Sequence, residues 1–128
     1  MKLLDSIPTL IIEPNILLME PYSCLPFTYQ VNRYPNLEFA SESFLTVQPQ
    51  LVMLSASFSP THIITFLEKV KNESVEAAEL IPIIFVIDLE NPLSFIPGTT
   101  WGKQIGVITS LSSPPEVYAT LQRVLTPA

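Results

Sequence analysis

The sequence is poor in cysteine and in basic residues. Its single cysteine, Cys24, has no second cysteine in the chain with which to form a disulfide. Six Lys and Arg stand against twelve Asp and Glu, and the six bases are scattered along the chain rather than clustered. Phosphate backbones and anionic lipids are attracted by clustered positive charge. We therefore expect neither nucleic acid nor a membrane surface as a partner.

Long apolar runs are also absent. The longest, Thr9–Ile12 and Ile81–Ile87, are far shorter than the roughly 20 residues that a membrane-spanning helix needs. No basic segment near the N-terminus leads into a long apolar stretch, since Asp5 and Pro8 interrupt it. We expect a cytoplasmic chain without a membrane span and, from its length of 128 residues, one domain over residues 1–128.

Glycine is scarce, with three residues against thirteen prolines. Because proline ends helices and is excluded from central strands, the prolines divide the chain into short elements. Five short apolar or alternating runs lie between them, and continuous apolar runs are typical of strands that are covered on both faces, as in a parallel sheet. The expected strands are Thr9–Ile12, Leu37–Ala40, Leu51–Leu54, Ile83–Ile87 and Ile105–Thr109.

Two segments show clear helical periodicity. Apolar residues recur at helical spacing over Thr61–Lys71, and Ser59 and Pro60 before them suit an N-cap and a first turn. Ser113–Glu116 has the spacing of a capping box, which predicts the start of a last helix. The apolar face of that helix consists of Val117, Leu121 and Val124.

Other segments have weaker patterns. Asn15–Val31 is apolar enough to cover a sheet, but Pro21 and Pro26 lie inside it, so we expect a kinked or broken helix. Leu89–Lys103 contains two prolines and two glycines and lacks a helical stripe, so we expect a long loop. Short helices are expected over Ser43–Val47 and Ser74–Leu80.

Strand and helix alternate through nearly the whole chain, which predicts an α/β fold. The best match is a flavodoxin-like, doubly wound parallel sheet of five strands in the order 2-1-3-4-5, with its site at the carboxyl ends of the strands. In this order of elements the chain resembles the receiver domain of two-component response regulators, the CheY-like fold. By this resemblance the loop Leu89–Lys103 replaces the family's fourth helix. The stretches that carry the resemblance are Leu10–Asn15, Gln48–Ser55, Ile81–Asp88 and Val107–Glu116.

The resemblance assigns the chemical positions of a receiver to residues of this sequence. Receivers hold magnesium with two acidic residues after the first strand, and these positions are Glu13 and Pro14. The phospho-accepting aspartate falls on Ser55, the switch threonine or serine on Ile87, and the lysine–proline pair on Ser110 and Leu111. Of these residues, only Glu13 keeps the chemistry of the family.

A crevice with one carboxylate, a proline and an isoleucine should neither bind magnesium nor accept a phosphoryl group. The resemblance therefore implies a degenerate pseudo-receiver that is not an enzyme and uses no metal or cofactor. Such a domain would act in signal transduction by binding another protein, or a second copy of itself as a homodimer. The candidate interaction residues are Trp101, Leu111 and Tyr118.

Other functions stay open at this stage. A small-molecule sensor or an enzyme could reuse the same crevice. A structural subunit could be stable only as a homo-oligomer, which 48% apolar and 14% charged residues permit. Ser55, His62 and Asp88 could be combined as a hydrolytic triad, but no Gly-x-Ser-x-Gly elbow accompanies them.

Several single residues also have two interpretations. Cys24 is a redox sensor or a packed thiol, and its neighbours include no cation that would lower a thiol pKa. Trp101 is an interface anchor or a lid on the edge of the sheet. We expect Glu13 to be a partly exposed carboxylate at a strand end, and Tyr22 to fill the core or a groove.

Overall fold

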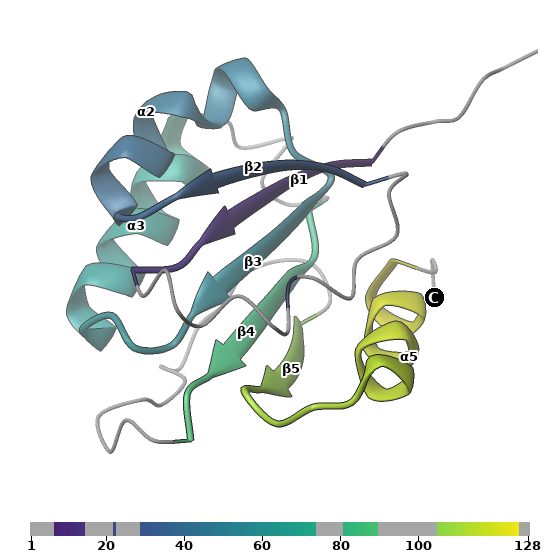
Figure 1. Cartoon of the computed structure of the whole chain (residues 1–128). Helices are drawn as coiled ribbons and strands as arrows, with labels where there is room; N and C mark the ends of the chain where they lie inside the picture. The colour runs from purple at the N-terminus through teal and green to yellow at the C-terminus, as the bar shows by residue number, and fades with distance from the viewer. Residues whose placement is uncertain (1–6, 15–21, 23–28, 74–80, 90–104, 126–128) are drawn as a thin grey trace, which may run out of the picture.

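The computed structural model describes residues 7–14, 22, 29–73, 81–89 and 105–125. Its strands are β1 (Ile7–Ile12), β2 (Tyr29–Tyr34), β3 (Leu51–Ser55), β4 (Ile83–Ile87) and β5 (Ile105–Thr109), and its helices are α2 (Leu37–Val47), α3 (Pro60–Glu73) and α5 (Pro114–Leu125). The strands form one parallel sheet in the order β2-β1-β3-β4-β5, which confirms the predicted fold (Figure 1). None of these helices is long and apolar enough to cross a membrane.

Helices cover both faces of the sheet, with α2 and α3 on one face and α5 on the other (Figure 1). Leu10 and Ile12 of β1 belong to the core under α2 and α3, while Ile11 between them belongs to the core under α5. β3 and β4 alternate in the same way. Continuous apolar runs therefore predict these strands correctly, because both faces of each strand are buried.

The second strand is not where the sequence pattern predicts it. Residues Leu37–Ala40 begin α2 instead of forming a strand. Asn36 is the local cause, because its Oδ1 accepts a hydrogen bond from the backbone N–H of Phe39 at 2.8 Å and so starts a helix. α2 then buries Ala40 and Phe44, which are one turn apart, against the sheet.

The strand β2 precedes α2 and overlaps the helix predicted over Asn15–Val31. That prediction is wrong for residues 29–31, and residues 15–21 and 23–28 lie outside the described part of the chain. β2 is an edge strand that pairs with β1 alone, so polar residues such as Gln30 and Asn32 are tolerated in it. The short helix predicted over Ser43–Val47 is the second half of α2.

Both strongly periodic helices are confirmed. α3 begins at Pro60, and its first turn is closed by a hydrogen bond from the Ile63 N–H to the Ser59 carbonyl at 3.0 Å. The capping box of α5 forms, since the Ser113 N–H donates to Glu116 Oε1 at 3.0 Å and the Glu116 N–H donates to Ser113 Oγ at 3.4 Å. Hydrogen bonds from the backbone and the side chain of Ser113 hold the pKa of the Glu116 carboxyl below its usual value.

Gly106 allows α5 to approach β5 closely. A Cβ atom at this position would lie 2.7 Å from Thr120 Cγ2 and 2.9 Å from Val124 Cγ1, so only glycine fits without a shift of α5. The contact also fixes the rotation of α5, because it turns the Thr120 side of the helix toward β5. The predicted helix Ser74–Leu80 and residues 90–103 of the predicted loop lie outside the described residues.

Candidate functional site

The predicted crevice lies where the strands end. Glu13 and Pro14 follow β1, Ser55 ends β3, Ile87 ends β4 and Ser110 follows β5. Because the strands are parallel, these residues share the carboxyl edge of the sheet (Figure 1). The Ser110 N–H donates to the Ile87 carbonyl at 2.8 Å, which joins two of the predicted positions directly.

Glu13 is completely buried, so the expectation of a partly exposed carboxylate is wrong. The hydroxyl of Tyr22, itself only 3% exposed, donates to Glu13 Oε1 at 2.7 Å. Arg33 Nη2 donates to the Glu13 backbone carbonyl at 3.1 Å and holds the same strand end against β2. A carboxylate without solvent access that already accepts a hydrogen bond from a phenol is a poor ligand for a dissolved cation.

The environment of Tyr22 fixes it in the protonated form. Burial is the largest cause of its raised pKa, followed by the Glu13 carboxylate and the hydrogen bond to it. Arg33 opposes the shift, but the pKa of Tyr22 still lies far above the usual value of 10.0. Tyr22 can therefore donate to Glu13 throughout the physiological pH range. The prediction that Tyr22 fills the core is correct for its ring, which packs in the core under α5. The sequence did not predict the hydrogen bond of its hydroxyl.

Ser55 is also completely buried, and its hydroxyl is used within its own turn. Its Oγ lies 2.6 Å from Ser57 Oγ and accepts a hydrogen bond from the Ser57 N–H at 3.2 Å. This side-chain-to-backbone contact closes the turn after β3. No hydrogen bond joins Ser55 to the exposed imidazole of His62 in the described part of the chain. A serine without a base in contact is a weak nucleophile, so the arrangement offers no hydrolytic triad.

The other two crevice positions are structural. Ile87 is half-buried and has no hydroxyl or charge to contribute. Ser110 Oγ accepts a hydrogen bond from the Leu89 N–H at 3.2 Å and so ties the turn after β4 to the turn after β5. In the described residues, no three His, Cys, Asp or Glu side chains come together as a metal site. The crevice holds Glu13 as its single predicted acid, and that acid is engaged by Tyr22.

Two of the three candidate interaction residues are described and are exposed. Leu111, in the turn between β5 and α5, is 78% exposed, and Tyr118 on α5 is 45% exposed. Residues 118 and 120 differ by about 200° around a helix. Since Thr120 packs toward β5, Tyr118 projects from the side of α5 that faces away from β5. Leu111 therefore tests the turn between β5 and α5, and Tyr118 tests the side of α5 that faces away from β5. Trp101 and Cys24 lie outside the described residues.

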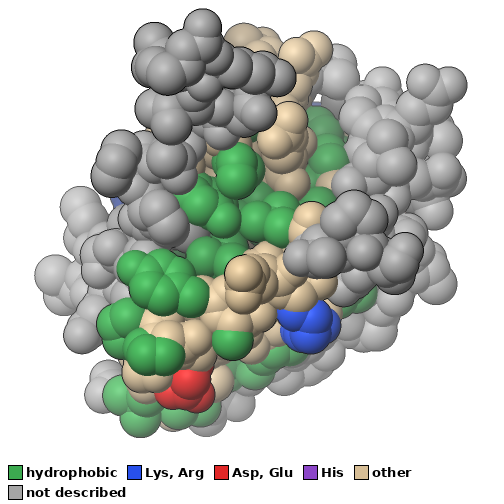
Figure 2. Space-filling model, turned by 90° about the vertical axis from the view of Figure 1, so that its right-hand side faces the viewer, with side chains coloured by type: hydrophobic (Ala, Val, Ile, Leu, Met, Phe, Trp, Pro, Cys, Tyr) green, Lys and Arg blue, Asp and Glu red, His purple; other side chains and the backbone are tan. Residues whose placement is uncertain are grey.

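The face of the molecule on which α5 lies is weakly charged. Figure 2 shows hydrophobic side chains spread over the described part of this face, with few acidic or basic ones among them. Val107, on the edge strand β5, is a further large apolar residue with 42% exposure. Exposed apolar surface with few charges is typical of a protein-binding surface.

No family model matches this chain, and no curated protein matches it in sequence. Solved structures do match it. A candidate response regulator from Chloroflexus aurantiacus is 18% identical with a TM-score of 0.70, over 91% of this chain and 95% of that one. The chemotaxis response regulator CheY4 of Vibrio cholerae is 17% identical with a TM-score of 0.71, over 93% of this chain and 98% of that one. The chain thus has the receiver fold, as the sequence resemblance predicts.

Proposed function

We propose that this chain is a pseudo-receiver: a non-catalytic, cytoplasmic signalling domain that acts by binding another protein, without aspartyl phosphorylation. The observation that carries the proposal is the state of the crevice. Ser55 is buried and bonded to Ser57, and Glu13 is buried and bonded to Tyr22. The fold of a receiver is retained while the groups that would perform its chemistry are replaced or engaged.

Phosphoryl transfer to a receiver needs a carboxylate nucleophile, a divalent cation and positive charge near the leaving group. A serine hydroxyl lacks the negative charge, and one carboxylate cannot fix an octahedral magnesium ion. Ile87 and Ser110 supply no hydroxyl at the switch position and no ammonium after β5. Each substitution alone would impair the reaction, and together they leave no step that the residues present could perform.

Incubation with acetyl phosphate and magnesium tests the absence of phosphorylation. We expect intact-protein mass spectrometry to detect no phosphate adduct, because Ser55 is fully buried and has no base in contact. A receiver that keeps its aspartate, treated in parallel, provides the positive control for the phosphodonor. A stable adduct on this chain at Ser55 or Glu13 would refute the proposal.

Substitution of Leu111 tests the protein-binding role. We expect Leu111→Ser to reduce recovery of the partner from a native lysate by about tenfold or more, because an anchor residue of a protein interface contributes about 2 kcal/mol or more. Phe39→Ser is the matched control. Phe39 is 52% exposed, but it lies on α2, on the opposite face of the sheet.

Tyr118→Ala distinguishes the side of α5 that faces away from β5 from the turn that contains Leu111. Loss of the partner with Leu111→Ser alone places the interface at the turn between β5 and α5, and loss with Tyr118→Ala alone places it on the side of α5 that faces away from β5. Quantitative mass spectrometry of the captured proteins provides the measurement, and capture of the unlabelled chain itself would identify the partner as a second copy. If both variants recover the same proteins as the wild type, this face is not the interface and the protein-binding proposal loses its support.

A further inference from the structure

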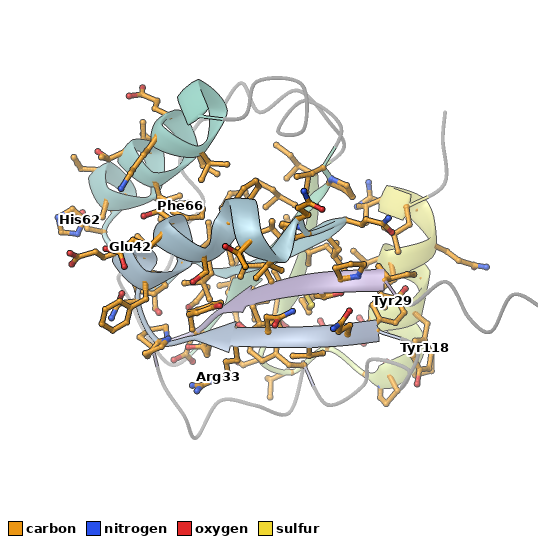
Figure 3. The ribbon with its side chains drawn as sticks, turned by 90° about the horizontal axis from the view of Figure 1, so that it is seen from above. Tyr29, Arg33, Glu42, His62, Phe66 and Tyr118 are labelled. Carbon is orange, nitrogen blue, oxygen red and sulfur yellow. The ribbon has the colours of Figure 1, made fainter. Side chains whose placement is uncertain are left out.

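A groove of about 400 Å³ lies between α2 and α3, on the face of the sheet opposite α5. Leu37, Phe58 and Phe66 contribute its apolar part, and all three pack against the core on that side. Figure 3 shows Phe66 between the two helices, with His62 nearer the start of α3. None of the predicted crevice positions lines this groove, so it is a separate feature of the fold.

Lys69 is held at this groove by a contact between the two helices. Its Nζ donates to Ser41 Oγ at 3.3 Å, although the residues are 28 positions apart in the sequence. Ser41 is only 4% exposed and in turn donates to the Glu38 carbonyl at 2.8 Å, so its position is fixed by α2. An ammonium group has three N–H donors, and this contact uses one of them. Lys69 therefore lies at the rim of the groove, and two of its N–H donors are not used by the contact with Ser41.

The charge of Lys69 is not balanced by an ion pair with an acidic side chain of the described residues. His62 lies two turns before it on the same side of α3 and also lines the groove, near the positive end of the helix dipole. Glu38, on the α2 side, is the one acidic residue in the lining. Apart from the imidazole, the lining carries one positive side chain, Lys69, and one negative side chain, Glu38. This balance admits a single negative charge beside Lys69 but disfavours a multiply charged anion such as phosphate.

We propose that the α2–α3 groove binds a small aromatic carboxylate, with the carboxylate on Lys69 and the ring against the partly buried Phe58 and Leu37. A carboxylate accepts charge-assisted hydrogen bonds from an ammonium group, and aromatic side chains favour contact with another ring. The volume lies at the small end of the usual range for ligand pockets, roughly 300 to 1,000 Å³, which suits a ligand with one ring. This inference does not depend on the pseudo-receiver proposal, because it concerns the other helical layer.

Titration with phenylacetate, followed by ¹⁵N NMR of the full chain, tests the site. We expect saturable shifts of backbone amides within residues 36–41 and 58–69. The neutral isostere phenylacetamide should bind at least about tenfold more weakly, because it removes the charge-assisted hydrogen bond but keeps the ring. Equal affinity for the two compounds, no saturable shift, or shifts confined to the carboxyl edge around Glu13 and Ser55 would overturn the proposal.

Lys69→Met keeps an unbranched side chain that is one heavy atom shorter and removes its charge. Lys69 is exposed, so we expect the variant to fold, with affinity for phenylacetate reduced at least about tenfold and affinity for phenylacetamide unchanged. Arg123→Met is the matched control, since it removes one positive charge from α5 on the opposite face. Ser41→Ala should weaken phenylacetate binding less than Lys69→Met, because the ammonium is retained but no longer positioned. Unaltered phenylacetate affinity in Lys69→Met would sink the proposal.

Discussion

Replacing Ser55 with aspartate should destabilise the domain rather than restore a receiver. We expect Ser55→Asp to lower the free energy of unfolding by about 3 kcal/mol or more, the range for an uncompensated buried charge. Ser55 is completely buried and lies between Leu54 and Ala56, which are equally buried. A carboxylate at this position would lose its hydration, and the mutation would also remove the Ser55 hydroxyl that contacts Ser57 at 2.6 Å.

The neighbouring strand makes the substitution worse. Ile12 of β1 pairs with Leu54 of β3, so Glu13 and Ser55 occupy the next positions on two adjacent strands. Glu13 is also fully buried, and two buried carboxylates side by side repel each other. In a receiver a cation balances such a pair. In this chain Tyr22 donates to Glu13, and a neutral hydroxyl does not compensate a second negative charge.

Urea denaturation monitored by circular dichroism measures the effect. Ser59→Asp is the matched control, because it introduces the same carboxylate four residues later, at an exposed position directly before α3. Aspartate is a favoured N-cap and interacts well with the positive end of a helix, so Ser59→Asp should be neutral or slightly stabilising. A Ser55→Asp variant that is as stable as the wild type and accepts phosphate from acetyl phosphate would show that the crevice is open to solvent, contrary to the burial of Ser55.

The central strands could be predicted from the sequence because burial on both faces leaves a simple pattern. β3 and β4 consist almost entirely of apolar residues, and the capping box and the buried apolar stripe of α5 are both recognisable in the sequence. β2 could not be predicted in the same way. It is an edge strand with Gln30, Asn32 and Arg33 in its six residues, and the apolar residues after it belong to a helix that Asn36 starts. The apolar-run pattern therefore fails for a strand at the edge of the sheet, whose residues are only partly buried.

The positions of the crevice could also be predicted, because topology alone brings the strand ends to one edge. The burial and the hydrogen-bond partners of the crevice residues could not be predicted. Tyr22 reaches Glu13 through a tertiary contact, and neither residue carries a local signal that the other is its partner. Lys69 and Ser41 illustrate the same limit, since their contact depends on α2, a segment that the pattern assigns in part to a strand. Since the sequence did not predict the burial of Glu13, it gave no reason to expect a hydrogen-bond donor beside it.

Tyr22→Phe removes the hydroxyl that donates to the Glu13 carboxylate. We expect the free energy of unfolding to fall by about 2 kcal/mol, the usual cost of losing a buried hydrogen bond to a charged group. The ring stays in the core under α5, so the loss comes from the carboxylate rather than from a cavity. Tyr29→Phe is the matched control. Tyr29 packs against the same core but is only partly buried, and its hydroxyl makes no hydrogen bond with the described residues, so its loss should cost less than about 0.5 kcal/mol.

The pH dependence gives this prediction a second, independent readout. The folded protein keeps the proton of Tyr22 because its pKa is raised, whereas the unfolded chain releases that proton above the usual pKa of 10.0. Above that pH the unfolded state binds fewer protons than the folded state, so the contribution of Tyr22 to stability is complete below pH 10 and declines as the pH rises further. Phenylalanine has no proton to lose, so the difference between wild type and Tyr22→Phe should shrink in the alkaline range. The other tyrosines are common to both chains and cancel. Two results would contradict the proposed role of the Tyr22 phenol in stabilising the Glu13 carboxylate. One is a stability difference between wild type and Tyr22→Phe that does not change with pH, and the other is a Tyr22→Phe variant as stable as Tyr29→Phe.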